Sequence, residues 1–273
     1  MPEIQIDSFL TTSLVVTAAM CLLAVLVAWY TVRDRIQFSQ IIVGVFCYIL
    51  ADLLGNVLDA GAASAGLSAT GLTYGLYIVL SVVITREIIR YLGLRYGIQS
   101  NFDTTDAAIG FAIGFAGAYL CICAAYYFNC YSTVREFTKN GAEAFWANTG
   151  DTAQEAQELL MMISGQSGWQ FVMTGLNRVF FLLREIALSV LLWYAMSEGG
   201  SKMWFGLIPL MHMLAMLPDG LYQAEILTNS YVKDGLTCVV SGGIAFLAAR
   251  QYNAKEDLVS HFKVEKLRAR RRK

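Results

Sequence analysis

The sequence predicts an all-α membrane protein, a polytopic helix bundle with about seven transmembrane helices. Of its 273 residues 56% are hydrophobic and only 15% are charged, and the mean hydropathy is +0.52. Apolar stretches near the roughly 20 residues that a bilayer-spanning helix needs recur along the whole chain. Because backbone groups in lipid must be satisfied internally, and because of the length and period of these stretches, we expect helices rather than a barrel.

The apolar stretches follow one another with short breaks. They cover residues 9–31, 37–56, 70–92, 105–128, 169–196, 203–222 and 232–250. If the N-terminus lies outside, most of the lysines and arginines between the stretches fall on the inner side, as the positive-inside rule requires. The sequence therefore predicts an N-out, C-in topology.

Nothing in the sequence divides the chain, so residues 1–273 are expected to form a single transmembrane domain. Residues 129–168 are the one sizeable extramembrane loop, in which a capping-box pattern from Asp151 to Glu155 and apolar residues at helical spacing predict an amphipathic helix. Residues 252–273 form a basic cytoplasmic tail. We interpret this tail as a topology determinant that contacts membrane lipids, not as a nucleic-acid site.

Charged residues inside the third apolar stretch are costly, because lipid cannot solvate them. Glu87 and Arg90 are three residues apart and share one helix face with Arg86 nearby. Such a cluster marks a polar chamber, where Glu87 can act as a general base or hold a water, or it marks an interfacial anchor. In the second case the arginines extend to the inner headgroups and Glu87 neutralises them. The spacing alone favours the anchor.

The fifth stretch carries Asn177, Arg178, Arg184 and Glu185 among apolar residues. Arg178 and Glu185 are seven residues apart, so they share a face at a separation of roughly 10.5 Å along the helix. Because neither reaches an interface easily from mid-span, we expect both to point into the bundle and to pair there. A structural ion-pair network and a substrate or ion site explain this pattern equally well.

The sixth stretch places His212 between Pro209 and Pro218, and each proline removes a helix hydrogen bond, so we expect a broken helix there. His212 is either a hydrogen-bonded core residue or a functional one. The only other histidine is His261 in the tail, and the chain has no His-Glu-x-x-His or Cys-x-x-Cys spacing. We therefore expect neither a dedicated metal site nor a cofactor.

A polar stripe in the second stretch has helical spacing. It consists of Tyr48, Asp52, Asn56 and Asp59. These residues either line a water path or pack against the fifth stretch.

Several segments carry a resemblance to a known family. They are residues 175–195, Leu210 to His212, Pro218, residues 221–223, and Arg86 to Tyr91 where the family has Glu-Glu-x-x-Arg-Tyr. Over nearly its whole length the chain resembles the YhfC family of bacterial multipass proteins. That family is regarded as a group of intramembrane endopeptidases related to the CAAX-processing and bacteriocin-processing proteases. The resemblance implies an integral protein of a bacterial-type cytoplasmic membrane.

The resemblance also implies paired glutamates that activate a water and intramembrane histidines that stabilise an oxyanion. In this sequence Arg86 stands at the first glutamate, and residues 112–118 lack the family's histidine and glutamate. Asn177 stands at another glutamate and Glu185 at another histidine. The residues of the implied site that remain are Glu87, Arg90, Tyr91, Arg178 and His212. Because the loss of one oxyanion donor typically costs about 10²–10³ in rate, we expect negligible peptidase activity.

Three functions are compatible with these observations. The favoured one is a hydrolase-like pseudoenzyme that binds a transmembrane peptide, a membrane protein or a lipid in the former active-site cavity. Its binding residues would be Arg90, Tyr91, Asn177, Arg178 and Glu185. An active intramembrane endopeptidase would use Glu87 and His212 in catalysis. A transporter or channel would use Asp52, the polar residues of the fifth stretch and the broken sixth helix.

Overall fold

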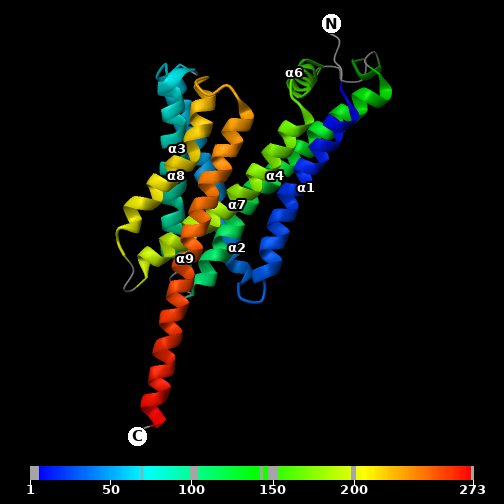
Figure 1. Cartoon of the computed structure of the whole chain (residues 1–273). Coiled ribbons are helices and arrows are strands. Elements are labelled where there is room, and N and C mark those ends of the chain that lie inside the picture. The colour runs from blue at the N-terminus through cyan, green and yellow to red at the C-terminus, as the bar shows by residue number, and fades with distance from the viewer. Residues whose placement is uncertain are drawn as a thin grey trace.

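The computed structural model is a bundle of long helices (Figure 1). It describes residues 6–68, 70–98, 104–141, 144–146, 153–197 and 201–271, with side chains up to residue 252. In these residues there is no β-strand, and seven helices are long and apolar enough to cross a membrane. The predicted class, a polytopic helical membrane protein, is confirmed.

The seven long helices agree closely with the predicted stretches. They are α1 (Ser8–Val32), α2 (Phe38–Ser64), α3 (Gly71–Leu92), α4 (Thr105–Asn140), α7 (Gly168–Met196), α8 (Trp204–Gln223) and α9 (Ser230–Arg271). A π-helical segment, η1 (Gly93–Ile98), extends α3, and the short helix α6 (Ala153–Ser164) precedes α7. Helix α8 continues through both Pro209 and Pro218, so the expected break in the sixth helix is wrong.

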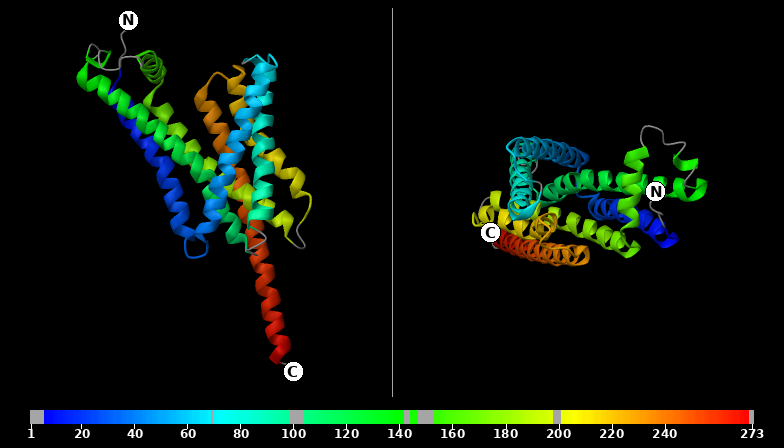
Figure 2. Two further views of the ribbon diagram at one scale, coloured as in Figure 1. Left: turned by 180° about the vertical axis from the view of Figure 1, so that it is seen from behind. Right: turned by 90° about the horizontal axis from the view of Figure 1, so that it is seen from above.

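The bundle divides into two arms toward the end that holds the N-terminus (Figures 1 and 2). One arm contains α1, the later part of α4 and the early part of α7, with α6 at its tip. The other arm contains α2, α3, α8 and the first part of α9. Helices α4 and α7 pack against each other and extend from the joined end of the molecule into the first arm. They therefore form the connection between the arms.

Close packing of α2 on α4 depends on glycine. A Cβ atom at Gly44 would overlap the backbone of α4 at Phe111 and Phe115, and one at Gly114 would overlap the backbone of α2 at Ile41. Small residues of this kind let helix backbones approach closely in a membrane, where the hydrophobic effect does not drive helix association.

Two apolar core clusters correspond to the two ends of the central helices. The first cluster joins α1, α4, α6 and α7 and includes Leu14, Leu120 and Leu182. The second joins α2, η1, α4, α7, α8 and α9 and includes Phe111 and Leu188. On α7 the buried members of the first cluster end at Leu182 and those of the second begin at Ala187, and the buried polar residues Arg184 and Glu185 lie between them.

The predicted loop at 129–168 begins later than expected. Helix α4 continues to Asn140, because Cys130 and Val134 are buried in the first cluster and keep the helix packed beyond the predicted end of the span. The predicted amphipathic helix is present as α6, and its Leu160 is fully buried. The expected capping residues Asp151 and Thr152 lie outside the described residues. The basic tail continues α9 as a helix to Arg271.

Candidate functional site

Five ionisable side chains from three helices meet in the interior of the bundle, and we name them the ion network. They are Glu87 and Arg90 of α3, Arg184 and Glu185 of α7, and His212 of α8. The guanidinium of Arg90 donates from Nη1 to Glu87 and from Nη2 to Glu185, so it bridges two carboxylates on different helices.

The remaining contacts close the ion network. Arg184 donates from Nε and Nη2 to Oε1 of Glu185, at 3.3 and 3.2 Å. The Nδ1 atom of His212 lies 2.5 Å from Oε1 of Glu87, and its Nε2 atom lies 3.8 Å from Oε1 of Glu185. Each carboxylate therefore contacts at least one arginine and lies beside the imidazole.

The ion network is almost completely removed from solvent and from lipid. Arg90, Glu185 and His212 are 0% exposed, Arg184 is 1% exposed and Glu87 is 9% exposed. On α7, Arg184 and Glu185 occupy the gap between the two apolar clusters. The other three members, Glu87, Arg90 and His212, lie on α3 and α8. These two helices pack closely, since Gly75 and Gly220 leave no room for a side chain between them.

The structure brings together most of the residues that the sequence suggested. Glu87 and His212, the pair assigned to catalysis if the protein is active, are in direct contact. Arg90 and Glu185 belong to the same network. The interfacial anchor that the spacing favoured is wrong for Arg90, since its side chain is fully buried. The polar chamber is the observed arrangement, but it is filled by the protein's own guanidinium groups.

The expected pairing of Arg178 with Glu185 is wrong. Glu185 is occupied by Arg90 from α3 and by its neighbour Arg184. Arg178 instead lies over the ring of Tyr119, with its guanidinium carbon 5.1 Å from the ring centroid. The two residues share a side of α7, but another helix supplies a closer cation to the acid.

Asn177 belongs to a second polar cluster, which we name the α9 cluster. Its Nδ2 atom donates to Oδ1 of Asp234 at 2.7 Å, and Thr174 donates to Oδ2 of the same carboxylate at 3.2 Å. Lys233 lies 3.1 Å from Asp234 and 3.6 Å from Asp219. This cluster ties α7, α8 and α9 together. Asp234 is not among the residues predicted from the sequence, although an acid inside the last apolar stretch is a signal for such a site.

Two other predicted sets lie apart from the ion network. Tyr91 packs its ring edge-on against Phe205, at 6.1 Å between centroids. In the stripe on α2, Tyr48 donates to Asp52 at 3.5 Å and Asp59 accepts from Tyr77 at 3.0 Å. Helix α2 packs on α4, α3 and η1, so of the two alternatives for this stripe, packing against the fifth span is wrong.

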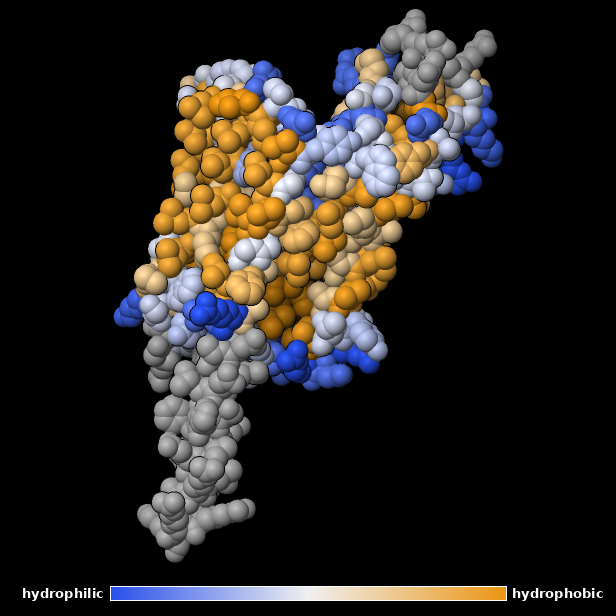
Figure 3. All heavy atoms as spheres, viewed as in Figure 1, coloured by the Kyte–Doolittle hydropathy of each residue, from blue (hydrophilic) through white to orange (hydrophobic). Residues whose placement is uncertain are grey.

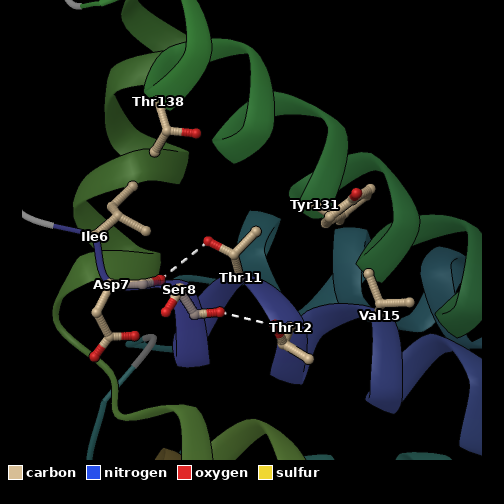
Figure 4. A pocket seen from close by; sticks show the side chains of 8 residues that line it. All are labelled: Ile6, Asp7, Ser8, Thr11, Thr12, Val15, Tyr131 and Thr138. Carbon is tan, nitrogen blue, oxygen red and sulfur yellow. Dashed lines mark hydrogen bonds between the residues drawn. The ribbon is translucent and has the colours of Figure 1, made fainter.

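A pocket lies far along the first arm, between the start of α1 and the end of α4 (Figure 4). Its volume is about 530 Å³, and its polar lining comes mainly from hydroxyl groups. Three of these already donate to backbone carbonyls of their own helices: Thr11 to Asp7, Thr12 to Ser8 and Thr138 to Val134. None of the ion-network residues lines this pocket.

The donor set of the ion network does not fit a divalent metal. Glu87, Glu185 and His212 are metal-binding residue types, but both carboxylates accept hydrogen bonds from Arg90 or Arg184. A guanidinium is not deprotonated in proteins and cannot act as a ligand. In the part of the chain that the structure describes, no group of three His, Cys, Asp or Glu residues is arranged to hold a metal ion.

A family model described as "YhfC intramembrane metalloprotease" matches residues 19–237, which is most of the chain. No curated protein and no solved structure matches this chain. The description implies a metal-dependent reaction, whereas the buried carboxylates of this chain are engaged by arginines.

Proposed function

Because the chain belongs to the YhfC family of intramembrane metalloproteases, we propose that it is a non-catalytic member of that family. In this proposal the former reaction centre has become a structural ion network, and the protein acts by binding a membrane-embedded ligand. We place it in a bacterial-type cytoplasmic membrane with its N-terminus outside.

One observation carries this proposal. Arg90 is fully buried and bridges Glu87 and Glu185, the two carboxylates nearest to His212. A carboxylate that accepts charge-assisted hydrogen bonds is held in its ionised form and in a fixed orientation. The contacts that would orient a water or a metal are thus made by the protein itself.

The charges of the ion network also support a structural role. Two arginines face two glutamates beside one histidine. A charge-balanced set of this kind, in which each glutamate is paired with an arginine, can be kept inside a membrane protein, whereas a single charge there is expensive. The network fixes α3, α7 and α8 to one another at the level where the two arms join.

The proposal is tested by an assay of the purified full-length protein in proteoliposomes, with a fluorogenic transmembrane peptide as substrate. We expect cleavage no faster than in empty liposomes, with the same result after addition of a chelator or of Zn²⁺. Glu87→Gln serves as the matched variant. Cleavage by the wild type that is lost in Glu87→Gln, in protein that retains its helical circular dichroism, would overturn the proposal.

A second candidate function is favoured by one specific contact. His212 lies 2.5 Å from Glu87, and Glu87 is the most exposed member of the ion network. An acid and an imidazole in contact form a general-base pair in many hydrolases. An active endopeptidase would require Arg90 to release Glu87 when substrate binds. This alternative predicts that His212→Ala and Glu87→Gln abolish cleavage to the same extent.

A further inference from the structure

Arg86 and Arg178 differ from the other cations in the interior of the bundle. Arg90, Arg184 and Lys233 each have a carboxylate within 4 Å. For Arg86 on α3 and Arg178 on α7, the described residues supply no such carboxylate. Both side chains are half-buried, and the Nε atom of Arg178 is fully buried without a hydrogen-bond partner.

The two guanidinium groups converge on one aromatic ring. The guanidinium carbon of Arg86 lies 5.7 Å from the centroid of Tyr119, and that of Arg178 lies 5.1 Å from it. Arg86 also lies 5.5 Å from the ring of Phe181, which packs on Tyr119 at 4.8 Å. Aromatic faces support cations at this distance. They do not neutralise them.

Acidic groups near this pair are engaged elsewhere. Asp219 acts on Arg178 through space, but its own contact is with Lys233 at 3.6 Å. Asp52 is the acid on the α2 side and accepts a hydrogen bond from Tyr48, whose ring lies 6.0 Å from that of Tyr119. The phenol oxygen of Tyr127 accepts a hydrogen bond from Arg178, but a neutral phenol does not compensate the charge of the guanidinium. Two positive charges therefore remain available at one place.

This place is where the two arms meet. Arg86 belongs to an arm formed by α2, α3, α8 and α9, whereas Arg178 belongs to the early part of α7 in the other arm. The space-filling view shows a hollow between the arms, bordered by more hydrophilic residues than the apolar outer faces (Figure 3).

We propose that Arg86 and Arg178, supported by the ring of Tyr119, bind the anionic headgroup of a lipid that enters between the two arms. This inference rests on the proposed function, because it names the ligand class of a non-catalytic binding protein. A guanidinium matches a phosphate or a carboxylate with two parallel hydrogen bonds. The lipid's charge would compensate the two arginines, and its acyl chains would lie along the apolar helix faces.

A lipid fits this place better than an extended peptide does. Every amide of a peptide in the membrane interior needs a hydrogen-bond partner. The site offers two guanidinium groups and the phenols of Tyr119 and Tyr127, which suit one anion. Around it, the helices of both arms expose many large apolar side chains, which suit acyl chains.

The test measures lipid binding to the purified full-length protein in detergent by native mass spectrometry. The probes are dioleoylphosphatidic acid, oleate, dioleoylglycerol and inorganic phosphate. We expect the phosphatidic acid or the oleate to bind, and the comparison of the two identifies the headgroup. Dioleoylglycerol, which has the same tails without the charge, should bind at least tenfold more weakly.

Variants locate the site. Arg86→Gln and Arg178→Gln should each weaken binding of the anionic lipid about tenfold or more, because each removes charge-assisted hydrogen bonds. Arg86→Lys should weaken it less. Arg135→Gln, at an exposed position near the end of α4, is the matched control and should bind like the wild type. Asp52→Asn should strengthen binding, since it removes a nearby negative charge.

Several outcomes would overturn the inference. They are equal binding of dioleoylglycerol, equally tight binding of inorganic phosphate, unchanged binding in both arginine variants, and displacement of the lipid by a peptide carboxylate at lower concentration. The outcome is separable from that of the cleavage assay. An inert protein without lipid binding would overturn only this inference, and a cleaving protein with lipid binding would overturn only the proposed function.

Discussion

Arg86 and Arg90 lie one turn apart on the same helix, yet only Arg90 contacts carboxylates among the described residues. Arg90 is fully buried and is neutralised by two glutamates from α3 and α7. Arg86 is half-buried and rests on aromatic rings, without a carboxylate within 4 Å in the described residues. The comparison teaches that charge in a membrane bundle can hold the fold together where the protein balances it. Where the protein leaves it unbalanced, the charge can attract a ligand.

The largest loss of stability is expected for Glu185→Gln. It removes the acid that faces both Arg90 and Arg184, so two buried guanidinium groups lose their shared partner. We expect a loss of about 3–5 kcal/mol in the free energy of unfolding. Thermal unfolding in detergent, followed by circular dichroism, measures it. Asp52→Asn is the control at an exposed acid, and equal melting of the two variants would contradict the structural role.

The double variant Glu185→Gln/Arg184→Met measures the interaction between the two residues directly. Arg184→Met removes a cation that Glu185→Gln leaves without its partner, so the two changes together should cost less than their sum. We expect a coupling of about 0.5–3 kcal/mol, as for residues in one buried network. A double-mutant cycle on unfolding free energies measures it. Strict additivity would mean that the two residues do not interact in the folded protein.

A substitution in the α9 cluster should lower the free energy of unfolding by less than one in the ion network. Asp234→Asn keeps an acceptor for Asn177 but weakens the contact with Lys233, and we expect a loss of about 1–3 kcal/mol. The same change at Asp59, an exposed acid that accepts a hydrogen bond from Tyr77, is the control. If both variants unfold at the same temperature, the α9 cluster does not hold α7 against α9.

The smallest effect on stability is expected at Arg86. Arg86→Met removes only contacts with aromatic rings, which are worth about 0.5–2 kcal/mol, and it also removes an uncompensated charge. We expect the melting temperature to change by less than that of Arg90→Met, measured under identical conditions. A larger loss in Arg86→Met than in Arg90→Met would reverse the comparison.

The candidate site was predictable only in part. Glu87, Arg90, Glu185 and His212 stood out because ionisable residues are rare in apolar stretches, and the structure brings these four together. Their pairing was not predictable, since helical spacing relates residues of one helix only. Arg178 and Glu185 share a side of α7, but the position of α3 in the bundle brings Arg90 to Glu185 instead.

The sequence by itself determined the helical membrane class, the number of spans and their approximate limits, because burial of backbone groups in lipid leaves few alternatives. Family membership also followed from segments readable along the chain. Which charges have a carboxylate partner and which lie over aromatic rings could be seen only in the folded bundle. The physical reason is that an ion pair requires its atoms to lie within a few ångströms, and that distance depends on how separate helices pack and rotate against one another.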